Sequence, residues 1–393
     1  MTYLYVIYSI LLGGLVVAGI REQQRHFANL GEIPARILVN GIRGKSSITR
    51  LCAGALRGGE LVVCAKTTGS AARFIWPDGH ESKVFRPFGI VNVSEQLKIV
   101  AQARTQHPDV LVMECMAVDP DLQELNQAKL VRSTIGVISN VREDHVEEMG
   151  PTLEDVARAL SRTMPWDGVC VTAERTWWNV LAEEAQRRRC RLVYADPETV
   201  GEDELEPFRW FTLKENVAIA LAVARELGVP RAAALRGMYA AAPDPGVLTV
   251  KRYELGGKTI RFANVFAAND PRSTVMNVER LVRIGEIEPP IIALVNCRPD
   301  RVDRNVQMGE IVPDLGADKL IVIGHPSRST IAAVRAGWSG EVVDLGGEDR
   351  DGDELLRAIV EEVDAEASVV AIGNIHGRGE VLLEHLEDIG AAA

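Results

Sequence analysis

One stretch near the start of the chain constrains the fold more than any other: an apolar run, two glycines, Lys-Ser and then a helical pattern. The run at residues 37–39 predicts a buried strand, and the chain then turns through Gly41 and Gly44. From Ser46 onward, apolar residues recur at helical spacing, so a helix follows the turn. A strand, a glycine loop and a helix in this order predict an α/β sheet with a phosphate-binding loop at the end of the strand.

The chemistry of this loop follows from its residue types. Glycines allow backbone N–H groups to turn inward, and a helix N-terminus favours an anion. Lys45 can reach the outer phosphates of a nucleotide, and the Ser46 hydroxyl can ligate Mg²⁺. The usual motif has four residues between its first glycine and Gly-Lys, whereas two separate Gly41 from Gly44 here, and an ordinary strand-to-helix turn is the alternative. The predicted nucleotide contacts are Asn40, Gly41, Ile42, Arg43, Gly44, Lys45, Ser46 and Ser47.

Length and composition limit the class of protein. A chain of 393 residues, of which 47% are hydrophobic and 25% charged, predicts a globular α/β protein of two or three domains. The formal net charge of −11 argues against general nucleic-acid binding. The six cysteines include no pair at metal-ligand spacing, so we expect buried thiols in a reducing compartment.

Residues 1–20 carry no charged side chain. As a helix they would span about 30 Å, the thickness of the hydrocarbon core of a bilayer. Arg21 and Arg25 follow at once, and the positive-inside tendency then places the rest of the chain in the cytoplasm, with residues 21–34 as a linker. A cleaved signal peptide and a buried N-terminal helix are the alternatives to this single-pass membrane anchor.

From residue 35 to residue 242, strand-like runs alternate with helical ones, which predicts a mostly parallel sheet covered by helices. Ligands of such sheets bind at the carboxyl ends of the strands. Polar clusters fall at three of these ends, at residues 40–47, at Glu114 and at residues 140–145. The predicted strands are residues 37–39, 110–113, 135–139, 169–172 and 192–194, and a helix is predicted at 215–227.

The sequence Pro-Asp-Pro-Gly at residues 243–246 predicts a domain boundary. After it we expect a hairpin, formed by residues 247–253 and 258–262, and then a second, smaller α/β domain that spans residues 246–393 in all. The predicted strands of this domain are residues 291–295, 320–323, 341–343 and 369–372.

Residues 65–87 are too polar and broken for a core element. Composition alone favours a solvated hairpin over a substrate-binding loop here. In an acidic protein, however, a local excess of cations suits an anionic substrate, whose contacts would weaken with salt. The candidate substrate contacts are Arg43, Lys66, Arg73, Lys83 and Arg86.

Two strand-end residues could complete a metal site beside the phosphate loop. Glu114 could hold Mg²⁺ together with Ser46, and His145 could be a second metal ligand or a phosphate contact. Taken singly, each is more often a plain surface residue, but both occur in one predicted sheet with a phosphate loop. The sequence therefore predicts Lys45, Glu114 and His145 as catalytic residues, and Ser46, Glu114 and His145 as metal ligands.

Together these motifs resemble those of the Mur ligase superfamily of ATP-dependent amide ligases, which includes folylpolyglutamate synthetase. Residues 41–46 are similar to its Gly-Thr-x-Gly-Lys-Thr/Ser loop, with isoleucine in place of threonine. Glu114 matches its metal-binding glutamate, and residues 139–145 are similar to its Thr-Asn-x-x-x-Asp-His segment. Asn216 matches its nucleotide-contacting asparagine. The resemblance covers nearly the whole chain from residue 35 onward.

In the second domain the resemblance is looser. Residues 269–273 are similar to the loop at the hinge side of the cleft in the superfamily. Residues 296–301 resemble its Gly-Cys-Gly-Gly-Asp-Arg segment, in which only Cys297, Asp300 and Arg301 match. The resemblance implies that Asp300 and Arg301 contact the nucleotide when this domain closes. The carbamylated lysine of many relatives has no clear counterpart here.

Within the superfamily, the chain looks most like the ligase subunits of poly-γ-glutamate synthases. The segments that carry this likeness are residues 40–46, 66–69, 76–79 and 266–271. Cell-wall Mur ligases place a UDP-binding domain of about a hundred residues, the size of a small domain, before the phosphate loop. There is no room for such a domain before Gly41, so a UDP-linked substrate is not expected.

The resemblance implies an ATP- and Mg²⁺-dependent carboxylate–amine ligase. It would join glutamate through γ-amides to a growing poly-γ-glutamate chain, by way of an acyl phosphate, at the cell membrane during capsule synthesis. A small integral-membrane partner subunit is implied and nucleic acid is not; a homo-oligomer is left open. The alternatives are a soluble folylpolyglutamate-type ligase and a membrane-anchored, ATP-binding regulatory or scaffold subunit.

Overall fold

The computed structural model describes residues 2–68, 72–86, 92–208, 210, 212–243, 248–266, 271–347 and 350–392. Internal contacts divide the chain into two compact units. Unit 1 consists of Met1–Phe208 and Thr212–Asp244, and unit 2 consists of Arg209–Phe211 and Pro245–Ala393. Most of the predicted boundary at residues 243–246 lies outside the described residues.

Unit 1 is built on an eight-stranded sheet in the order β4-β3-β2-β5-β1-β6-β7-β8. Neighbouring strands run parallel except in the β2–β3 and β3–β4 pairs, which are antiparallel, and β3 and β4 form a hairpin at one edge. The carboxyl end of β1 therefore lies between those of β5 and β6. The strands are β1 (Ala35–Asn40), β2 (Val63–Lys66), β3 (Arg73–Ile75), β4 (Glu81–Lys83), β5 (Val110–Glu114), β6 (Ile135–Ile138), β7 (Val169–Thr172) and β8 (Arg191–Tyr194).

Helices cover both faces of this sheet. One face carries α2, α9 and α10, which pack on one another, and the other carries α3, α4, η2, α6 and α7. The first of these, α2, begins directly after the phosphate loop. The helices are α2 (Lys45–Gly58), α3 (Glu95–Arg104), α4 (Pro120–Leu125), η2 (Asn126–Val131), α5 (Val146–Met149), α6 (Leu153–Ser161), α7 (Trp178–Arg187), η3 (Pro197–Thr199), α8 (Glu202–Leu205), α9 (Lys214–Glu226) and α10 (Arg231–Tyr239).

The chain begins with one uninterrupted helix, α1 (Thr2–Gly31). The stretch predicted as a linker is helical as far as Gly31, because its last turns pack on α3 and η2. The His26 ring nitrogen Nε2 lies 3.0 Å from the Leu130 carbonyl oxygen of η2, and the Arg132 guanidinium lies 5.3 Å from the centre of the Phe27 ring. The end of α1 is therefore docked on unit 1.

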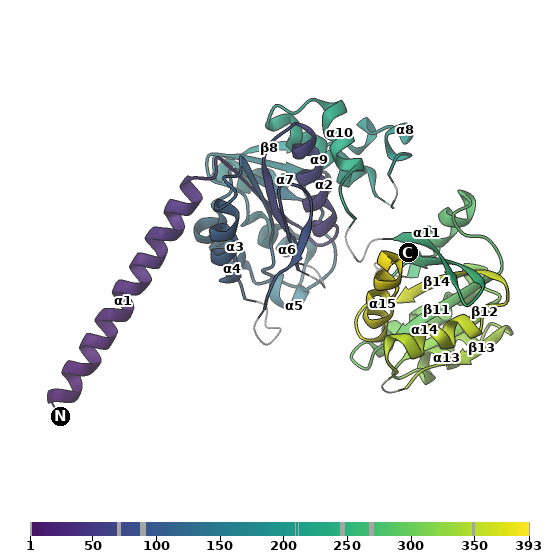
Figure 1. Cartoon of the computed structure of the whole chain (residues 1–393). Coiled ribbons are helices and arrows are strands. Elements are labelled where there is room, and N and C mark those ends of the chain that lie inside the picture. Colours follow the sequence, from purple (N-terminus) through teal and green to yellow (C-terminus); the bar gives the residue numbers. More distant parts are fainter. Residues whose placement is uncertain are drawn as a thin grey trace. The chain divides into compact units, whose positions relative to one another are not determined.

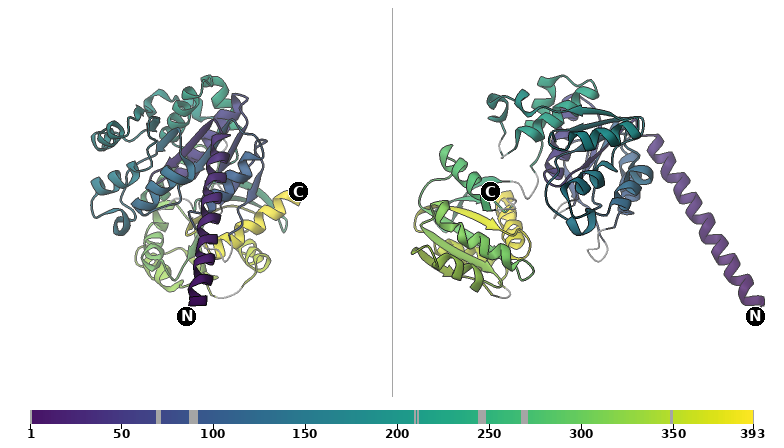
Figure 2. Two further views of the ribbon diagram at one scale, coloured as in Figure 1. Left: turned by 90° about the vertical axis from the view of Figure 1, so that its left-hand side faces the viewer. Right: turned by 180° about the vertical axis from the view of Figure 1, so that it is seen from behind.

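The first part of α1 has a different environment. Its apolar side chains are exposed, among them Tyr5, Leu12 and Leu15. Figures 1 and 2 show this part of the helix extending away from the sheet as a straight rod. By length and composition the segment Tyr5–Gly31 could cross a membrane.

Unit 2 is a second α/β unit, with a six-stranded sheet in the order β13-β12-β11-β14-β10-β9. The expected hairpin is present as β9 and β10, which turn through Gly256 and Gly257 at positive φ. Apolar cores lie on both faces of the sheet. The strands are β9 (Thr249–Leu255), β10 (Lys258–Asn264), β11 (Ile291–Cys297), β12 (Lys319–Gly324), β13 (Glu341–Asp344) and β14 (Glu366–Gly373).

The helices of unit 2 lie between its strands in the chain, as expected for crossover connections, except for α15, which follows the last strand. They are α11 (Pro271–Arg283), α12 (Val302–Glu310), η4 (Val312–Leu315), α13 (Arg328–Arg335), α14 (Gly352–Glu361) and α15 (Arg378–Ala392). The mostly parallel α/β architecture predicted from the sequence is confirmed. The strand β2 was not predicted, because its four residues end in a lysine and stand at the start of a polar stretch.

Candidate active site

The phosphate loop leaves β1 through two glycines that no other residue could replace without strain. Gly41 has φ +129°, and a Cβ atom there would lie 2.0 Å from the Ser139 hydroxyl oxygen. Gly44 has φ +79° and caps α2, and a Cβ atom there would lie 3.2 Å from the Asn216 side-chain oxygen. The same contact shows that Asn216, on α9, lies against the loop, as its predicted role requires.

The loop is shaped by the end of β6. The Asn140 side chain accepts a hydrogen bond from the Arg43 N–H (3.0 Å) and donates one to the Arg43 carbonyl oxygen (3.1 Å). The Ser139 hydroxyl donates to that carbonyl oxygen as well, at 2.7 Å. These bonds fix the backbone between Gly41 and Gly44 before any ligand binds. Sequence reasoning had placed Asn140 in a motif without giving it this task.

The Lys45 ammonium lies over the loop. It donates to the carbonyl oxygens of Gly41 (2.8 Å) and Ile42 (3.2 Å). A nucleotide phosphate would be a stronger partner than either neutral oxygen, because a hydrogen bond between two charged groups is roughly twice as strong. The residue is thus held where the sequence motif requires it.

A candidate metal site, lined by a hydroxyl and a carboxylate oxygen, adjoins the loop. The hydroxyl of Ser46 donates to Oε2 of Glu114 at 2.9 Å, and the Thr68 N–H donates to the same oxygen at 2.6 Å. Hydroxyl and carboxylate oxygens are ligands that Mg²⁺ prefers, and Mg²⁺ usually takes its remaining ligands from water and substrate phosphates. Among the described residues, no group of three or more His, Cys, Asp and Glu stands together as a metal site. The two oxygens therefore fit Mg²⁺ bound together with a nucleotide.

The loop, Thr68 and His145 surround one cavity of about 150 Å³. His145 directly precedes α5 and has φ +51°, and its side chain is about half exposed. The neighbouring Asp144 carboxylate lies 3.2 Å from the Arg43 guanidinium. The cavity is lined by Asn40, Gly41, Ile42, Lys45, Thr68, Cys115, Met116, Ala117, Val118, His145 and Met149.

Two further residues were predicted as nucleotide contacts, Asn40 and Ser47. The buried Asn40 side chain points into the protein, where it donates to Gln123 (2.8 Å) and Thr163 (3.2 Å). Ser47 lies in the first turn of α2, next to Ser46. Only backbone contacts to a phosphate are therefore open to Asn40 in this arrangement.

Glu174 is a residue of the site region that sequence reasoning missed. Its carboxylate accepts a hydrogen bond from the Val141 N–H at 3.0 Å and lies 3.8 Å from the Arg142 guanidinium. Glu174 lies just after β7, much as Glu114 lies at the end of β5. A carboxylate at a strand end was therefore the signal that could have identified it. Glu174 holds the segment that leads to His145.

The predicted substrate cations fall into two groups. Arg73 and Lys83 are directly opposite each other in the β3–β4 hairpin. Lys66 is completely buried, and its ammonium lies 2.7 Å from a Glu95 carboxylate oxygen. Arg86 reaches the other oxygen of Glu95, also at 2.7 Å. Lys66 and Arg86 thus direct their charges into the protein.

Asp300 and Arg301 belong to unit 2. Two hydrogen bonds, of 2.9 and 2.7 Å, join the Arg298 guanidinium to the Asp300 carboxylate. The exposed Arg301 directly precedes α12. In the same unit, residues 269 and 270 of the predicted hinge loop lie outside the described residues.

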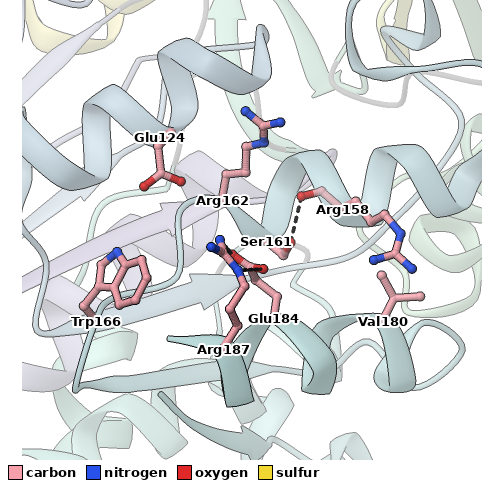
Figure 3. A pocket seen from close by; sticks show the side chains of 8 residues that line it. All are labelled: Glu124, Arg158, Ser161, Arg162, Trp166, Val180, Glu184 and Arg187. Carbon is pink, nitrogen blue, oxygen red and sulfur yellow. Dashed lines mark hydrogen bonds and ion pairs between the residues drawn. The ribbon is translucent and has the colours of Figure 1, made fainter. Parts of the chain in front are cut away.

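A larger hollow, of about 390 Å³, lies elsewhere on unit 1 and contains none of the predicted site residues (Figure 3). Its arginines are neutralised by nearby carboxylates: Arg158 by Glu154 and Glu183, Arg162 by Asp121, and Arg187 by Glu184. An anionic ligand would have to break these ion pairs before it could bind to the arginines. We therefore interpret the residues around this hollow as a network of ion pairs and not as a ligand site. It is lined by Glu124, Arg158, Ser161, Arg162, Trp166, Val180, Glu184 and Arg187.

Several known proteins are similar to this chain in sequence or in fold. The family described as the Mur ligase middle domain matches residues 39–209. E. coli FolC in complex with DHPP and ADP superposes with a TM-score of 0.64 at 16% identity, covering 94% of this chain and 93% of that one. The bifunctional folylpolyglutamate synthase/dihydrofolate synthase of Yersinia pestis, complexed with AMPPNP and Mn, gives 0.65 at 17% identity, with coverage of 94% and 93%. Fold and site together define an ATP-dependent amide ligase of the Mur ligase type.

Three further matches give the particular family. Residues 250–389 match the family described as the poly-gamma-glutamate synthase CapB C-terminal domain. The capsule biosynthesis protein CapB of Bacillus anthracis is 37% identical over 387 residues, which cover 96% of this chain and 82% of that protein. The PGA synthase CapB of Bacillus subtilis (strain 168) is 35% identical over 379 residues, which cover 95% of each. The chain belongs to the CapB family of poly-γ-glutamate synthases.

Proposed function

We propose that this chain is the catalytic ligase subunit of a poly-γ-glutamate synthase, which uses ATP to join glutamates through γ-amide bonds. The observation that carries the proposal is the convergence of Ser46, Glu114 and the Lys45 loop at the ends of β1 and β5. The proposed second metal ligand, His145, favours catalysis over ATP binding alone, because a protein that only binds ATP needs no second metal ligand. The matched CapB proteins support glutamate as the substrate.

The reaction has two steps. A carboxylate oxygen of the acceptor attacks the γ-phosphorus of ATP, and ADP leaves, which gives an acyl phosphate. The amine nitrogen of the incoming substrate then attacks the acyl carbon; an amide forms, phosphate leaves, and the amine proton passes to solvent or phosphate. Both steps need charge neutralisation and exclusion of water, because water would hydrolyse the acyl phosphate.

The residues of the loop would supply this neutralisation. Lys45 would move from its carbonyl partners to the γ-phosphoryl group. Mg²⁺, held by Ser46 and Glu114, would supply further positive charge at the phosphates, and His145 is the proposed ligand of a second ion. Asn216, Asp300 and Arg301 are proposed nucleotide contacts on the evidence of the family resemblance.

The proposed contacts for the anionic polymer are Arg43, Arg73 and Lys83. Arg73 is directly opposite Lys83 in the hairpin, so both side chains lie on one face of it and could contact the same anionic group. The pairs that Lys66 and Arg86 make with Glu95 favour a different role for those two residues.

The proposed location is the cytoplasmic side of the cell membrane, with residues 1–20 as a single-pass anchor. The exposed apolar half of α1 and the arginines that follow it support this. Resistance of the full chain to alkaline extraction from membranes tests the anchor, and release into the supernatant would contradict it. A small integral-membrane partner, proposed from the resemblance alone, would serve export of the polymer.

The function is tested by incubating membranes that contain the full chain with ATP, Mg²⁺ and labelled D- or L-glutamate. We expect labelled polymer and glutamate-dependent phosphate release. Lys45→Ala and Glu114→Ala should each lower the rate by about 100-fold or more, because each removes charge stabilisation of the transferred group. Cooperative thermal unfolding of both variants would show that they fold.

Two results would contradict the proposal. Normal turnover by folded Glu114→Ala would remove the metal assignment. A preference of the purified ligase for folate or UDP-linked acceptors over glutamate would replace the substrate assignment with that of a different Mur-type ligase.

A further inference from the structure

Near the proposed metal site, one carboxylate pairs with two cationic side chains. Glu95, the first residue of α3, receives the Lys66 ammonium on Oε1 at 2.7 Å and the Arg86 guanidinium on Oε2 at 2.7 Å. The Lys66 side chain is completely buried, and those of Glu95 and Arg86 are only 9% and 15% exposed. The three residues come from β2, from the segment after β4 and from α3, so the cluster ties these elements together.

This cluster is directly connected to Glu114. Lys66 pairs with Met113 in the β2–β5 ladder, and its ammonium also lies 3.8 Å from the Met116 sulfur, which lines the cavity. Two residues after Lys66, the Thr68 N–H holds the Glu114 carboxylate. Burial holds the pKa of Lys66 below its ordinary value; the hydrogen bond and charge of Glu95 oppose this fall, the charge of Arg86 adds to it, and the charge of Glu114 opposes it to a smaller extent.

The charges of these four residues balance. Lys66 and Arg86 are positive, and Glu95 and the 3%-exposed Glu114 are negative. A divalent cation that bound to Glu114 would therefore enter a region without net negative charge, where desolvation of the ion is poorly offset. A nucleotide, with its several negative charges, would supply what the protein lacks.

We propose that Lys66 is a positioning residue that offsets the charge of Glu114 and aims the Thr68 N–H at it, so that the protein binds free Mg²⁺ weakly and takes the metal together with ATP. The inference rests on the proposed metal role of Glu114. It goes beyond that role by assigning Lys66, Arg86 and Glu95 to the control of metal affinity and not to the substrate.

The test measures binding of Mn²⁺ to the full chain without nucleotide, by electron paramagnetic resonance of the free ion. Lys66→Met replaces the ammonium with an unbranched apolar side chain one atom shorter and leaves Glu95 paired with Arg86. Removal of one buried positive charge should tighten Mn²⁺ binding about tenfold or more. Glu95→Gln removes a negative charge of the same cluster and should weaken binding.

The opposite signs distinguish this inference from structural damage, which would weaken binding in both variants. Lys98→Met, at an exposed position of α3, is the matched control and should leave the affinity unchanged. If folded Lys66→Met binds Mn²⁺ no more tightly than the natural chain, the inference is wrong, whether or not Glu95→Gln folds. If Glu114→Gln binds Mn²⁺ as well as the natural chain, the metal role of Glu114 is wrong, and the inference falls with it.

Discussion

Arg73 carries its charge on the β3–β4 hairpin, opposite Lys83 and near the segment that holds Glu114. Its backbone N–H donates to the Thr67 hydroxyl at 3.3 Å, and its carbonyl oxygen accepts from the Thr67 N–H at 2.9 Å. These backbone contacts do not involve the guanidinium, so the charge of Arg73 can be changed without disturbing them.

We therefore expect Arg73→Glu to raise the KM for glutamate or for a polymer primer about five- to tenfold, with little change in the KM for ATP. Attraction between exposed charges is screened by salt, so the difference should shrink as ionic strength rises. Lys98→Glu, a charge reversal of the same size on α3, is the control. Equal KM values for glutamate in the Arg73 variant and the natural chain would exclude Arg73 from substrate binding.

The second prediction at this scale concerns Glu95 and pH. Burial raises the pKa of its carboxyl, but hydrogen bonds from Arg86 and Lys66 more than offset this, so that the pKa lies below the ordinary value of 4.5. A depressed carboxyl pKa stabilises the fold fully above about pH 4.5, and this contribution is lost as the pH falls through the folded-state pKa.

Urea unfolding of the natural chain and of Glu95→Gln at several pH values measures this contribution. We expect the difference in unfolding free energy to be largest near neutral pH and to shrink as the pH falls below about 4.5. A difference that stayed constant down to about pH 3 would show that ionisation of Glu95 does not contribute.

At the scale of elements, the helix that begins at the phosphate loop depends on a glycine contact. Gly54 and Gly58 of α2 face Gly237 of α10 so closely that a Cβ atom on Gly237 would lie 2.1 Å from the Gly54 carbonyl oxygen. A Cβ atom on Gly58 would meet the Ala233 carbonyl oxygen at the same distance. The backbones of the two helices are thus in direct contact.

Gly237→Ala should destabilise unit 1 by about 2 kcal/mol, because overpacking a tight contact costs more than alanine gains in helix propensity. Chemical denaturation measures the change, and nucleotide binding should weaken with it if α2 shifts. Gly31→Ala is the control, since a Cβ atom there would meet nothing within 4 Å. An unchanged denaturation midpoint for Gly237→Ala would mean that the helices separate at little cost.

The elements that sequence could predict are those defined by nearby residues. The β1–loop–α2 unit, with Gly41, Gly44 and Lys45, shows its strand, turn and helix within a dozen residues of sequence. The same holds for Glu114, because a carboxylate directly after an apolar run marks a strand end. The alternation of strands and helices then fixed a mostly parallel sheet.

What sequence could not predict depends on residues far apart in the chain. Lys66 resembles a surface cation until Glu95 and Arg86 are brought beside it by folding. The strand β2 is short and ends in that same lysine, so its pattern alone did not distinguish it from a loop. The helical character of residues 21–31 arises from packing on α3 and η2, which no local pattern records.

At the scale of the whole of unit 1, α1 is joined to the phosphate loop by only one strand and a short connection. The docked end of α1 is followed by β1, and Gly41 comes directly after that strand. The proposed anchor and the phosphate loop are thus joined by the docked end of α1, a short turn at residues 32–34 and β1. A continuous helix fixes the rotation of unit 1 about the helix axis as well as its distance from the membrane. The number of residues in α1 therefore determines which side of the ligase faces a given direction around that axis.

This rotational phase can be measured. One alanine inserted after Gln23 should turn unit 1 by about 100° relative to the anchor, whereas four should return it to within about 40° of its natural phase and lift it about 6 Å. We expect polymer formation in membranes to fall with one or two added residues and to recover with four, while ATP binding stays constant. Insertions of flexible Gly and Ser residues of the same lengths are the control.

If activity were the same for every length, the anchor would be a simple tether. If it follows the period of the helix, the enzyme has a front and a back with respect to its membrane. A foreign transmembrane helix could then replace residues 1–20 only when joined in phase.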